Sequence, residues 1–286
     1  MIFTGFLRGD EVSSRDLVYW NYFDGVIEGA NAFEVAGNND TCWILIHSYA
    51  ATPLEMKGLA LAISEEFGDR VLAVRLAGHG EVPGNLYGLS MEDWYSQVSG
   101  DFERVVLECG DVNIVGSSFG GALSLRLAED YDFKNLYVIN GYIFPTYEWY
   151  YIFSPNFYLD IFSSVLHYSK KGDVAKINDP EGLGSHIAYR NFVFSPVKDS
   201  RDFLDGVYGN LSLIEEGFLI QYSSGDRVAE PGVALEVFER VGSESKEFVL
   251  FERSNHVILA DYDAGDAIEN VLAFERRNRQ AKVLIF

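Results

Sequence analysis

Residues 112–130, VNIVGSSFGGALSLRLAED, place two adjacent serines in a glycine-rich turn between two apolar segments. The β-branched run over 112–115 predicts a buried strand, and the apolar spacing over 122–129 predicts a helix. A strand, then Gly-x-Ser-x-Gly, then a helix is typical of a nucleophile elbow, in which a serine stands at the top of a tight, strained turn. A glycine-rich turn whose serines do no chemistry is the alternative interpretation.

The neighbours of each serine decide which one fits the apex of such a turn. The turn requires small residues two positions before and two positions after the nucleophile. Ser118 meets this requirement, because Gly116 and Gly120 flank it at those positions. Ser117 would have a valine and a phenylalanine there, and both side chains are bulky. We therefore expect Ser118 to be the nucleophile.

Short apolar runs and helical patterns alternate along most of the chain, after an expected two-stranded antiparallel start within 17–35. This alternation predicts the α/β class, with a mostly parallel twisted sheet flanked by helices. Strands are expected over 41–46, 70–75, 112–115, 134–139, 217–222 and 247–251, and helices over 53–67, 91–109, 122–129, 231–241 and 263–276.

The alternation breaks after residue 141, where the chain becomes irregular and rich in aromatic residues, beginning YIFPTYEWYYIF. We therefore expect one core built from 1–141 and 213–286, with a lid or cap over 142–212 inserted after the sixth strand. Dense aromatic side chains can line an apolar pocket for an acyl group. They can equally serve only to pack the lid onto the core.

A serine hydroxyl is a weak nucleophile and needs a base, which an acid must orient. Asp226 follows the predicted strand over 217–222, and His256 follows the strand over 247–251. Because the carboxyl ends of parallel strands meet at one edge of a sheet, these side chains should lie near Ser118. We predict a catalytic triad of Ser118, Asp226 and His256.

The remaining candidates for the acid and the base are weaker. Asp261 and Asp263 are rivals of Asp226 for the role of the acid. His47 and His79 lie near predicted core strands, and structural roles in loops are expected for both. His167 and His186 lie in the predicted lid and have no nucleophile close in sequence.

Composition and charge limit the class of partner. The chain has 286 residues, 48% of them hydrophobic, and a net charge of −21. Such an acidic protein is poorly suited to nucleic acid or to an anionic membrane surface. No apolar run approaches the length of a membrane-spanning helix, so stable membrane insertion is not expected. The oligomeric state is not predicted.

Cysteine use and the N-terminus bear on the compartment. The two cysteines, Cys42 and Cys109, lie in segments expected to be a buried strand and a helix end, and we interpret them as free thiols. The first residues lack the charged start and long apolar stretch of a signal peptide. Both observations favour a reducing, cytoplasmic location.

Several separate motifs occur in an order that resembles the α/β-hydrolase superfamily, specifically its bacterial carboxylesterase and monoacylglycerol lipase branch. The resemblance covers about residues 41–275. In some related hydrolases the acid follows the sixth strand, but here that position is Asn140, which cannot ionise. The matching segments are His-Ser-Tyr at 47–49 with Thr-Pro at 52–53, RLAGHG at 75–80, MEDW at 91–94, the glycine-rich turn at 116–121, Asp226, and SNHV at 254–257.

The resemblance implies a mechanism and an oxyanion hole. His256 would take the proton of Ser118 as it attacks an ester carbonyl, and water would later release the acyl group. The backbone N–H groups of Tyr49 and Phe119 would bind the oxyanion. No metal or organic cofactor is implied. The family's usual glycine before Tyr49 is replaced by Ser48, whose Cβ could turn that donor away.

The resemblance also implies a small-molecule ester substrate. Esters of short to medium acyl length, or monoacylglycerols, are expected over emulsified triacylglycerols, because the acidic surface does not suit an anionic lipid interface. A peptidase, thioesterase or carbon–carbon hydrolase would use the same triad, since fold and triad do not choose the leaving group. A protein that binds a small molecule without catalysis is a further alternative.

Overall fold

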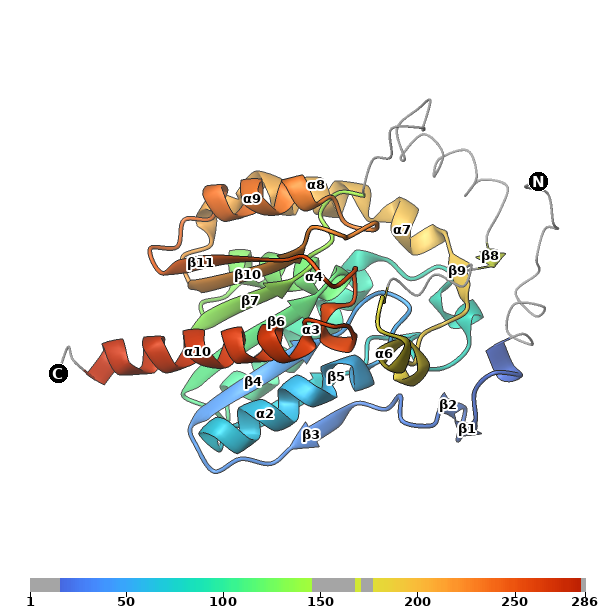
Figure 1. Cartoon of the computed structure of the whole chain (residues 1–286), viewed down its shortest axis with the longest axis horizontal. Helices are drawn as coiled ribbons and strands as arrows, with labels where there is room; N and C mark the ends of the chain where they lie inside the picture. The colour runs from blue at the N-terminus through green and yellow to red at the C-terminus, as the bar shows by residue number, and fades with distance from the viewer. Residues whose placement is uncertain (1–15, 146–167, 171–176, 284–286) are drawn as a thin grey trace.

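The computed structural model describes residues 16–145, 168–170 and 177–283 (Figure 1). At its centre lies a seven-stranded sheet with the strand order β11-β10-β7-β6-β4-β5-β3. Neighbouring strands are parallel, except that β3 runs antiparallel to β5. The α/β class with a mostly parallel sheet is therefore confirmed.

The strands of this sheet form where the sequence places its apolar runs. The strand predicted over 112–115 is longer than expected, because Gly116 and Ser117 still pair with β7 before the chain turns. The strands are β3 (Phe33–Val35), β4 (Thr41–Ile46), β5 (Arg70–Val74), β6 (Asp111–Ser117), β7 (Asn135–Ile139), β10 (Gly217–Ser223) and β11 (Lys246–Phe251).

Helices cover both faces of the sheet (Figure 1). Side chains alternate across a strand, so Ile44 of β4 packs in one apolar cluster and Leu45 packs in the other. Burial on both faces explains why the strands are apolar at nearly every position. One face carries α3 (Met91–Val106), α4 (Phe119–Asp130), α8 (Arg201–Asn210) and α9 (Pro231–Arg240), and the other carries α2 (Lys57–Phe67) and α10 (Ala264–Val283).

Helix α3 shows how local sequence sets such an element. Its N-terminus is a capping box, in which Asp93 N–H donates to Ser90 Oγ (3.3 Å) and Ser90 N–H donates to Asp93 Oδ2 (2.8 Å). Its buried side chains recur at helical spacing, so a single face of the helix meets the sheet. These side chains are Met91, Trp94, Val98, Phe102 and Val105.

The start of the chain contains one more strand than expected. A hairpin of β1 (Tyr22–Phe23) and β2 (Val26–Ile27) turns at Asp24 and Gly25, which both have a positive φ. Asp-Gly is the dipeptide that such a two-residue turn favours. Because β3 is a third strand and joins the main sheet, the predicted lid follows the seventh strand of the chain rather than the sixth.

Part of the predicted lid is described. There β8 (Tyr168–Lys170) pairs antiparallel with β9 (Asn191–Val193), and the short helices α6 (Pro180–Ser185) and α7 (Ser195–Asp199) flank them. Helix α8 continues from α7 and contacts α4 of the core. Most of the aromatic stretch that begins the lid lies outside the described residues, as does His167. The division into a core over 1–141 and 213–286 and a lid over 142–212 stays a prediction.

The two cysteines are not free thiols, so that prediction is wrong. Cys42 and Cys109 form a disulfide, with their Cα atoms 6.0 Å apart. The pairing follows from the order of the strands. Because β4 lies beside β6, the turn after α3 returns next to the start of β4, where Gly110 N–H donates to Asp40 O (2.9 Å). Paired cysteines do not indicate a reducing compartment, so a cytoplasmic location no longer follows from them.

The longest described helix, α10, packs one face against the sheet and carries charges on the other. Ala267, Val271 and Phe274 are buried in the core, and Arg276 on the outer face pairs with Glu66 of α2 (2.7 Å). Neither α10 nor any other helix within the described ranges combines the length and the apolar character that crossing a membrane requires.

Candidate active site

The turn between β6 and α4 holds Ser118 in a strained conformation. Its φ is 54° and its ψ is −117°, a combination that favours glycine in most proteins. A Cβ on Gly116 would lie 2.2 Å from Gly120 O, and a Cβ on Gly120 would lie 2.2 Å from Ile46 O. Both glycines are therefore required by close backbone approach, and Ser118 stands at the apex of the turn.

The structure brings together the three residues that the sequence predicts as a triad. His256 Nε2 lies 2.8 Å from Ser118 Oγ, and His256 Nδ1 lies 2.7 Å from Asp226 Oδ2. All three side chains are buried. Ser118 follows β6, Asp226 follows β10 and His256 follows β11, so the carboxyl edge of the sheet assembles them.

The second oxygen of Asp226 fixes the orientation of this carboxylate. Asp226 Oδ1 accepts hydrogen bonds from the N–H groups of Val228 (2.7 Å) and Ala229 (3.1 Å). Oδ2 is then directed at the imidazole. Since a carboxylate only accepts hydrogen bonds, His256 Nδ1 carries a proton and Nε2 can accept the proton of the Ser118 hydroxyl.

Asp261 and Asp263, the alternative candidates for the acid, instead hold backbone segments in place. Asp261 accepts hydrogen bonds from the N–H groups of Asn178, Asp179, Asn255 and Tyr262, and so holds loops together. Asp263 likewise accepts from backbone N–H groups next to β11 and pairs with Arg253 Nε at 2.7 Å. Within 16–145, 168–170 and 177–283, His, Cys, Asp and Glu side chains form no group that could hold a metal ion.

Asn140 supports the site in a way that sequence reasoning missed. It follows β7 with a positive φ of 43°, and its side chain is buried. Its Nδ2 donates to His256 O (2.7 Å), and its Oδ1 accepts from Ser223 N–H (2.8 Å). It thereby ties the loop that carries His256 to β10. A polar residue at the carboxyl end of a core strand was the available signal.

The two N–H groups predicted to form an oxyanion hole are free to donate. Neither Tyr49 N–H nor Phe119 N–H donates a hydrogen bond to any residue in the described part of the chain. Phe119 begins α4, where unpaired donors and the helix dipole favour negative charge. The Tyr49 side chain is held by its hydroxyl, which donates to Val193 O at 2.6 Å, and its ring centroid lies 5.1 Å from that of Phe119.

Ser48, which replaces the glycine expected before Tyr49, places its hydroxyl on the buried side of the loop. Ser48 Oγ donates to Glu55 Oε1 (2.7 Å) and lies 3.0 Å from Ser117 Oγ. The Cβ of residue 48 is therefore accommodated, with its hydroxyl directed away from solvent. Glu55 gave no signal in the sequence, where it is one acidic residue at the start of a helical pattern.

His47 and His79 are buried and lie behind the Tyr49 loop. Leu76 N–H donates to His47 Nε2 (3.2 Å), so His47 Nδ1 donates to Ser48 O (2.8 Å). Burial lowers the pKa of His47 to about 4 and holds the pKa of His79 well below its usual value. Both rings are therefore neutral supports of loops, as expected from the sequence. His186 ends α6, where its N–H donates to Gly182 O (3.0 Å).

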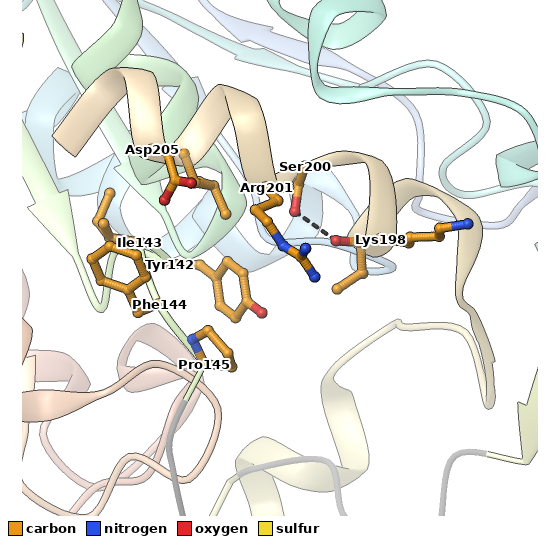
Figure 2. A pocket seen from close by; sticks show the side chains of 10 residues that line it. Tyr142, Ile143, Phe144, Pro145, Lys198, Ser200, Arg201 and Asp205 are labelled. Atoms are coloured by element: carbon orange, nitrogen blue, oxygen red, sulfur yellow. Dashed lines mark hydrogen bonds between the residues drawn. The ribbon is translucent and has the colours of Figure 1, made fainter. Parts of the chain in front are cut away.

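A pocket lies between the segment after β7 and helices α7 and α8 (Figure 2). Tyr142 links it to the nucleophile, because Tyr142 N–H donates to Ser118 O (2.9 Å) and its ring stacks on Phe119 with centroids 4.8 Å apart. Figure 2 shows Tyr142 opposite Arg201 of α8, with Ser200 at the junction of α7 and α8. The lining residues are Tyr142, Ile143, Phe144, Pro145, Val197, Lys198, Ser200, Arg201, Leu204 and Asp205.

Residues 36–269 match the model of the alpha/beta hydrolase family. The matched region contains the central sheet from β4 to β11 and all three residues of the hydrogen-bonded chain at its carboxyl edge.

Two of the proteins similar to this chain are a lipase and an esterase. The chain is 29% identical to a thermostable monoacylglycerol lipase of Bacillus sp. (strain H-257) over 256 residues, which cover 87% of this chain and 95% of that protein. It is 22% identical to a carboxylesterase of Bacillus subtilis (strain 168), covering 82% and 92%. A solved structure described with the metagenome-derived lipolytic enzymes LipS and LipT superposes with a TM-score of 0.78 at 24% identity, covering 88% and 99%. The predicted resemblance is confirmed.

Proposed function

Because the chain belongs to the α/β-hydrolase family, we propose that it is a serine hydrolase that cleaves carboxylic esters of short to medium acyl length through an acyl-enzyme. The observation that carries this proposal is the hydrogen-bonded chain from Ser118 through His256 to Asp226. The names of the two Bacillus relatives, a monoacylglycerol lipase and a carboxylesterase, support an ester as the substrate.

In the first step Ser118 Oγ attacks the ester carbonyl carbon, and its proton passes to His256 Nε2 over the 2.8 Å that separates these atoms. Asp226 stabilises the imidazolium that forms. The proton then passes to the alcohol as it leaves, which gives the acyl-enzyme. Water, activated by the same imidazole, attacks the acyl carbon and restores the Ser118 hydroxyl.

The negative charge of each tetrahedral intermediate needs donors at the nucleophile. We assign this role to the N–H groups of Phe119 and Tyr49, which are unoccupied among the described residues. Removing one such donor typically reduces kcat about 10²- to 10³-fold. Phe119 is fixed by the elbow helix, whereas Tyr49 depends on the loop after β4 and on its contacts.

The substrate's acyl group is proposed to pack against the apolar wall beside Tyr142. Tyr142, Ile143, Phe144 and Pro145 line the pocket from the core side, and Leu204 lines it from α8. Each methylene that such a wall buries contributes about 0.8 kcal/mol. The net charge of −21 opposes adsorption on anionic lipid, so dissolved esters and monoacylglycerols are the proposed substrates over emulsified triacylglycerols.

Ser118→Ala tests the reaction class. We expect hydrolysis of p-nitrophenyl butyrate and labelling by a fluorophosphonate probe to be lost, with kcat reduced by about four to six orders of magnitude. Ser117→Ala is the matched control, because it removes the neighbouring hydroxyl and leaves the elbow. It should retain labelling and lose no more than about 100-fold in kcat, far less than Ser118→Ala, because Ser118 and the elbow stay in place. An active Ser118→Ala protein would contradict the proposal.

A series of p-nitrophenyl esters from acetyl to palmitoyl tests the substrate class. We expect kcat/KM to rise with chain length, pass through a maximum and fall within the series, with little activity on emulsified triacylglycerol. A maximum at palmitoyl with strong activation by an interface would contradict a soluble-ester substrate. Thioesters and aminoacyl anilides, assayed alongside, show whether esters are the preferred acyl donors.

A further inference from the structure

A buried carboxyl lies behind the loop that carries Tyr49. Glu55 belongs to the short helix over Pro53–Met56 and is only 7% exposed. Its Oε1 accepts a hydrogen bond from Ser48 Oγ (2.7 Å), and Ser48 Oγ lies 3.0 Å from Ser117 Oγ. All three side chains are buried, so they form a connected hydrogen-bonded bridge shielded from solvent, which we call the Ser48 bridge.

The Ser48 bridge joins the two halves of the proposed oxyanion hole. Ser48 directly precedes Tyr49, and Ser117 directly precedes Ser118 and the elbow helix that begins with Phe119. Before Ser48, the chain meets the elbow through the pairing of Ile46 with Gly116, and after it through ring contacts such as that of Tyr49 with Phe119. A directional contact between Ser48 and Ser117 therefore sets how the Tyr49 backbone lies relative to the nucleophile.

The position of Glu55 is costly for stability. Its Oε2 is buried and has no hydrogen-bond partner among the described residues, although buried polar atoms almost always have one. Burial raises the pKa of Glu55, and the Ser48 and Ser117 hydroxyls and the charge of His256 oppose this shift only in part. A side chain retained for stability alone would be apolar here, because burying a carboxyl with one unpaired oxygen destabilises the fold.

We infer that Glu55 is a positioning residue, which through Ser48 and Ser117 holds the Tyr49 N–H in line with the oxyanion that forms on Ser118. Position 48 has a serine where glycine is usual, and the hydroxyl of this serine allows Glu55 and Ser117 to hold the loop in place. The inference rests on the proposed function and deepens it. The side-chain hydrogen bond of Glu55 goes to Ser48 and not to Ser118, so Glu55 would act through its neighbours.

Two substitutions at Glu55 separate the hydrogen bond from the shape. Glu55→Leu removes the acceptor, and we expect kcat to fall about 10- to 100-fold, less than the loss of a whole donor, with KM within about threefold. Glu55→Gln keeps a carbonyl oxygen for Ser48 Oγ, and we expect kcat within about threefold of the unmodified protein. Rescue by the conservative variant would show that the acceptor is what matters.

A trifluoromethyl ketone distinguishes positioning from a general loss of structure. Ser118 Oγ adds to its carbonyl carbon, the hydroxyl proton goes to His256, and the electron pair goes to the carbonyl oxygen as an oxyanion in the hole. We expect Ki for this ketone to rise in Glu55→Leu by the same factor as kcat/KM falls. A fall in kcat with an unchanged Ki would overturn the inference.

Ser48→Ala provides an independent second variant, which is informative even if Glu55→Leu does not fold. It breaks both contacts of the bridge, so its loss in kcat should equal that of Glu55→Leu. The double variant should lose no more than either single one, because residues of one network are not additive. Full multiplication of the two losses, or full activity of Ser48→Ala, would contradict the bridge.

Glu275→Gln is the matched control, since Glu275 is also a buried carboxyl and lies outside the site. We expect its melting temperature to fall while kcat and the Ki of the ketone stay unchanged. Failure of the inference and failure of the proposed function are distinguishable. If Ser118→Ala is inactive while Glu55→Leu and Ser48→Ala are fully active, only the inference fails; if Ser118→Ala is active, the proposed function fails.

Discussion

A buried glutamate lies at each end of the strands of the central sheet, Glu55 at the carboxyl edge and Glu275 at the amino edge. The two differ in how many hydrogen bonds their oxygens accept. Glu55 lies behind the carboxyl edge, where the described part of the chain gives one of its oxygens a hydrogen bond and the other none. Glu275 of α10 lies at the amino edge, where both oxygens are paired. Its partners are Lys134 Nζ (2.8 Å), Asn135 Nδ2 (2.7 Å), Tyr137 Oη (2.9 Å) and Arg279 Nε (2.7 Å).

The pKa shifts of these groups follow their partners. Burial raises the pKa of Glu55, and the hydrogen bonds to this carboxyl and the charge of His256 do not cancel that effect. Burial acts in the same direction on Glu275, but the hydrogen bond and charge of Lys134, followed by Arg279 and Tyr137, lower its pKa. The surroundings of Glu275 therefore stabilise an ionised carboxylate, and those of Glu55 do not. The strained Ser118 also stands at the carboxyl edge, where chemistry is proposed, and such strain is common at active sites.

Substitution of Asp226 should give the largest effect and should act on rate alone. Asp226→Asn leaves the hydrogen bonds from Val228 and Ala229 available but no longer fixes the His256 tautomer. We expect kcat to fall about 10⁴-fold, with the melting temperature within a few degrees of the unmodified protein. Ester hydrolysis and thermal unfolding of the same preparation measure both.

Asp261→Asn is the control for that experiment, because within the described ranges Asp261 accepts hydrogen bonds from backbone N–H groups of neighbouring loops and from no side chain. Its kcat should stay within an order of magnitude. If the Asp226→Asn protein were active and the Asp261→Asn protein inactive, the acid of the triad would be Asp261 and not Asp226.

Substitution of Lys134 should give the next largest effect and should act on stability alone. Lys134 is almost fully buried against Glu275, so Lys134→Met leaves that carboxylate short of a cation. Breaking a buried ion pair by removing one partner costs about 3 kcal/mol or more. We expect the free energy of unfolding in urea to fall by about that amount, with kcat/KM unchanged. A large loss of activity in the folded protein would show that the two edges are coupled.

The pH dependence of stability should show opposite signs at the two edges, with the smallest effect of the three. The folded pKa of Glu275 is lowered, so its contribution is present above the unfolded value of about 4.3 and is lost as pH falls through the folded pKa. The folded pKa of Glu55 is raised, so its contribution is present below about pH 4.3 and is lost as pH rises through the folded pKa.

Two variants measure that difference. Glu275→Gln should become more destabilising as pH rises towards about 4.3 and stay so above it. Glu55→Gln should become more stabilising, relative to the unmodified protein, as pH rises above about 4.3. Urea unfolding at pH 3.5, 5 and 7 checks both. The same sign for both variants would contradict the contrast between the edges.

The sequence by itself determined the alternation of strands and helices and the choice of Ser118 over Ser117. These features depend on residues close together in the chain. Apolar spacing specifies a strand or a helix over a few residues, and the elbow restricts only positions 116 and 120 around its serine. The order of Asp226 and His256 after their strands was informative because all parallel strands present their carboxyl ends at one edge.

Only the tertiary structure decided which distant side chains meet. Cys42 and Cys109 are separated by 67 positions, Ser48 and Ser117 by 69, and Asn140 and His256 by 116. The first two pairs meet because β4 lies beside β6, and the third meets because the His256 loop returns over β7 and β10. No local pattern encodes which strands become neighbours, since that order is set by packing of the whole sheet against its helices. The disulfide, the Ser48 bridge and the role of Asn140 therefore emerge only from the fold.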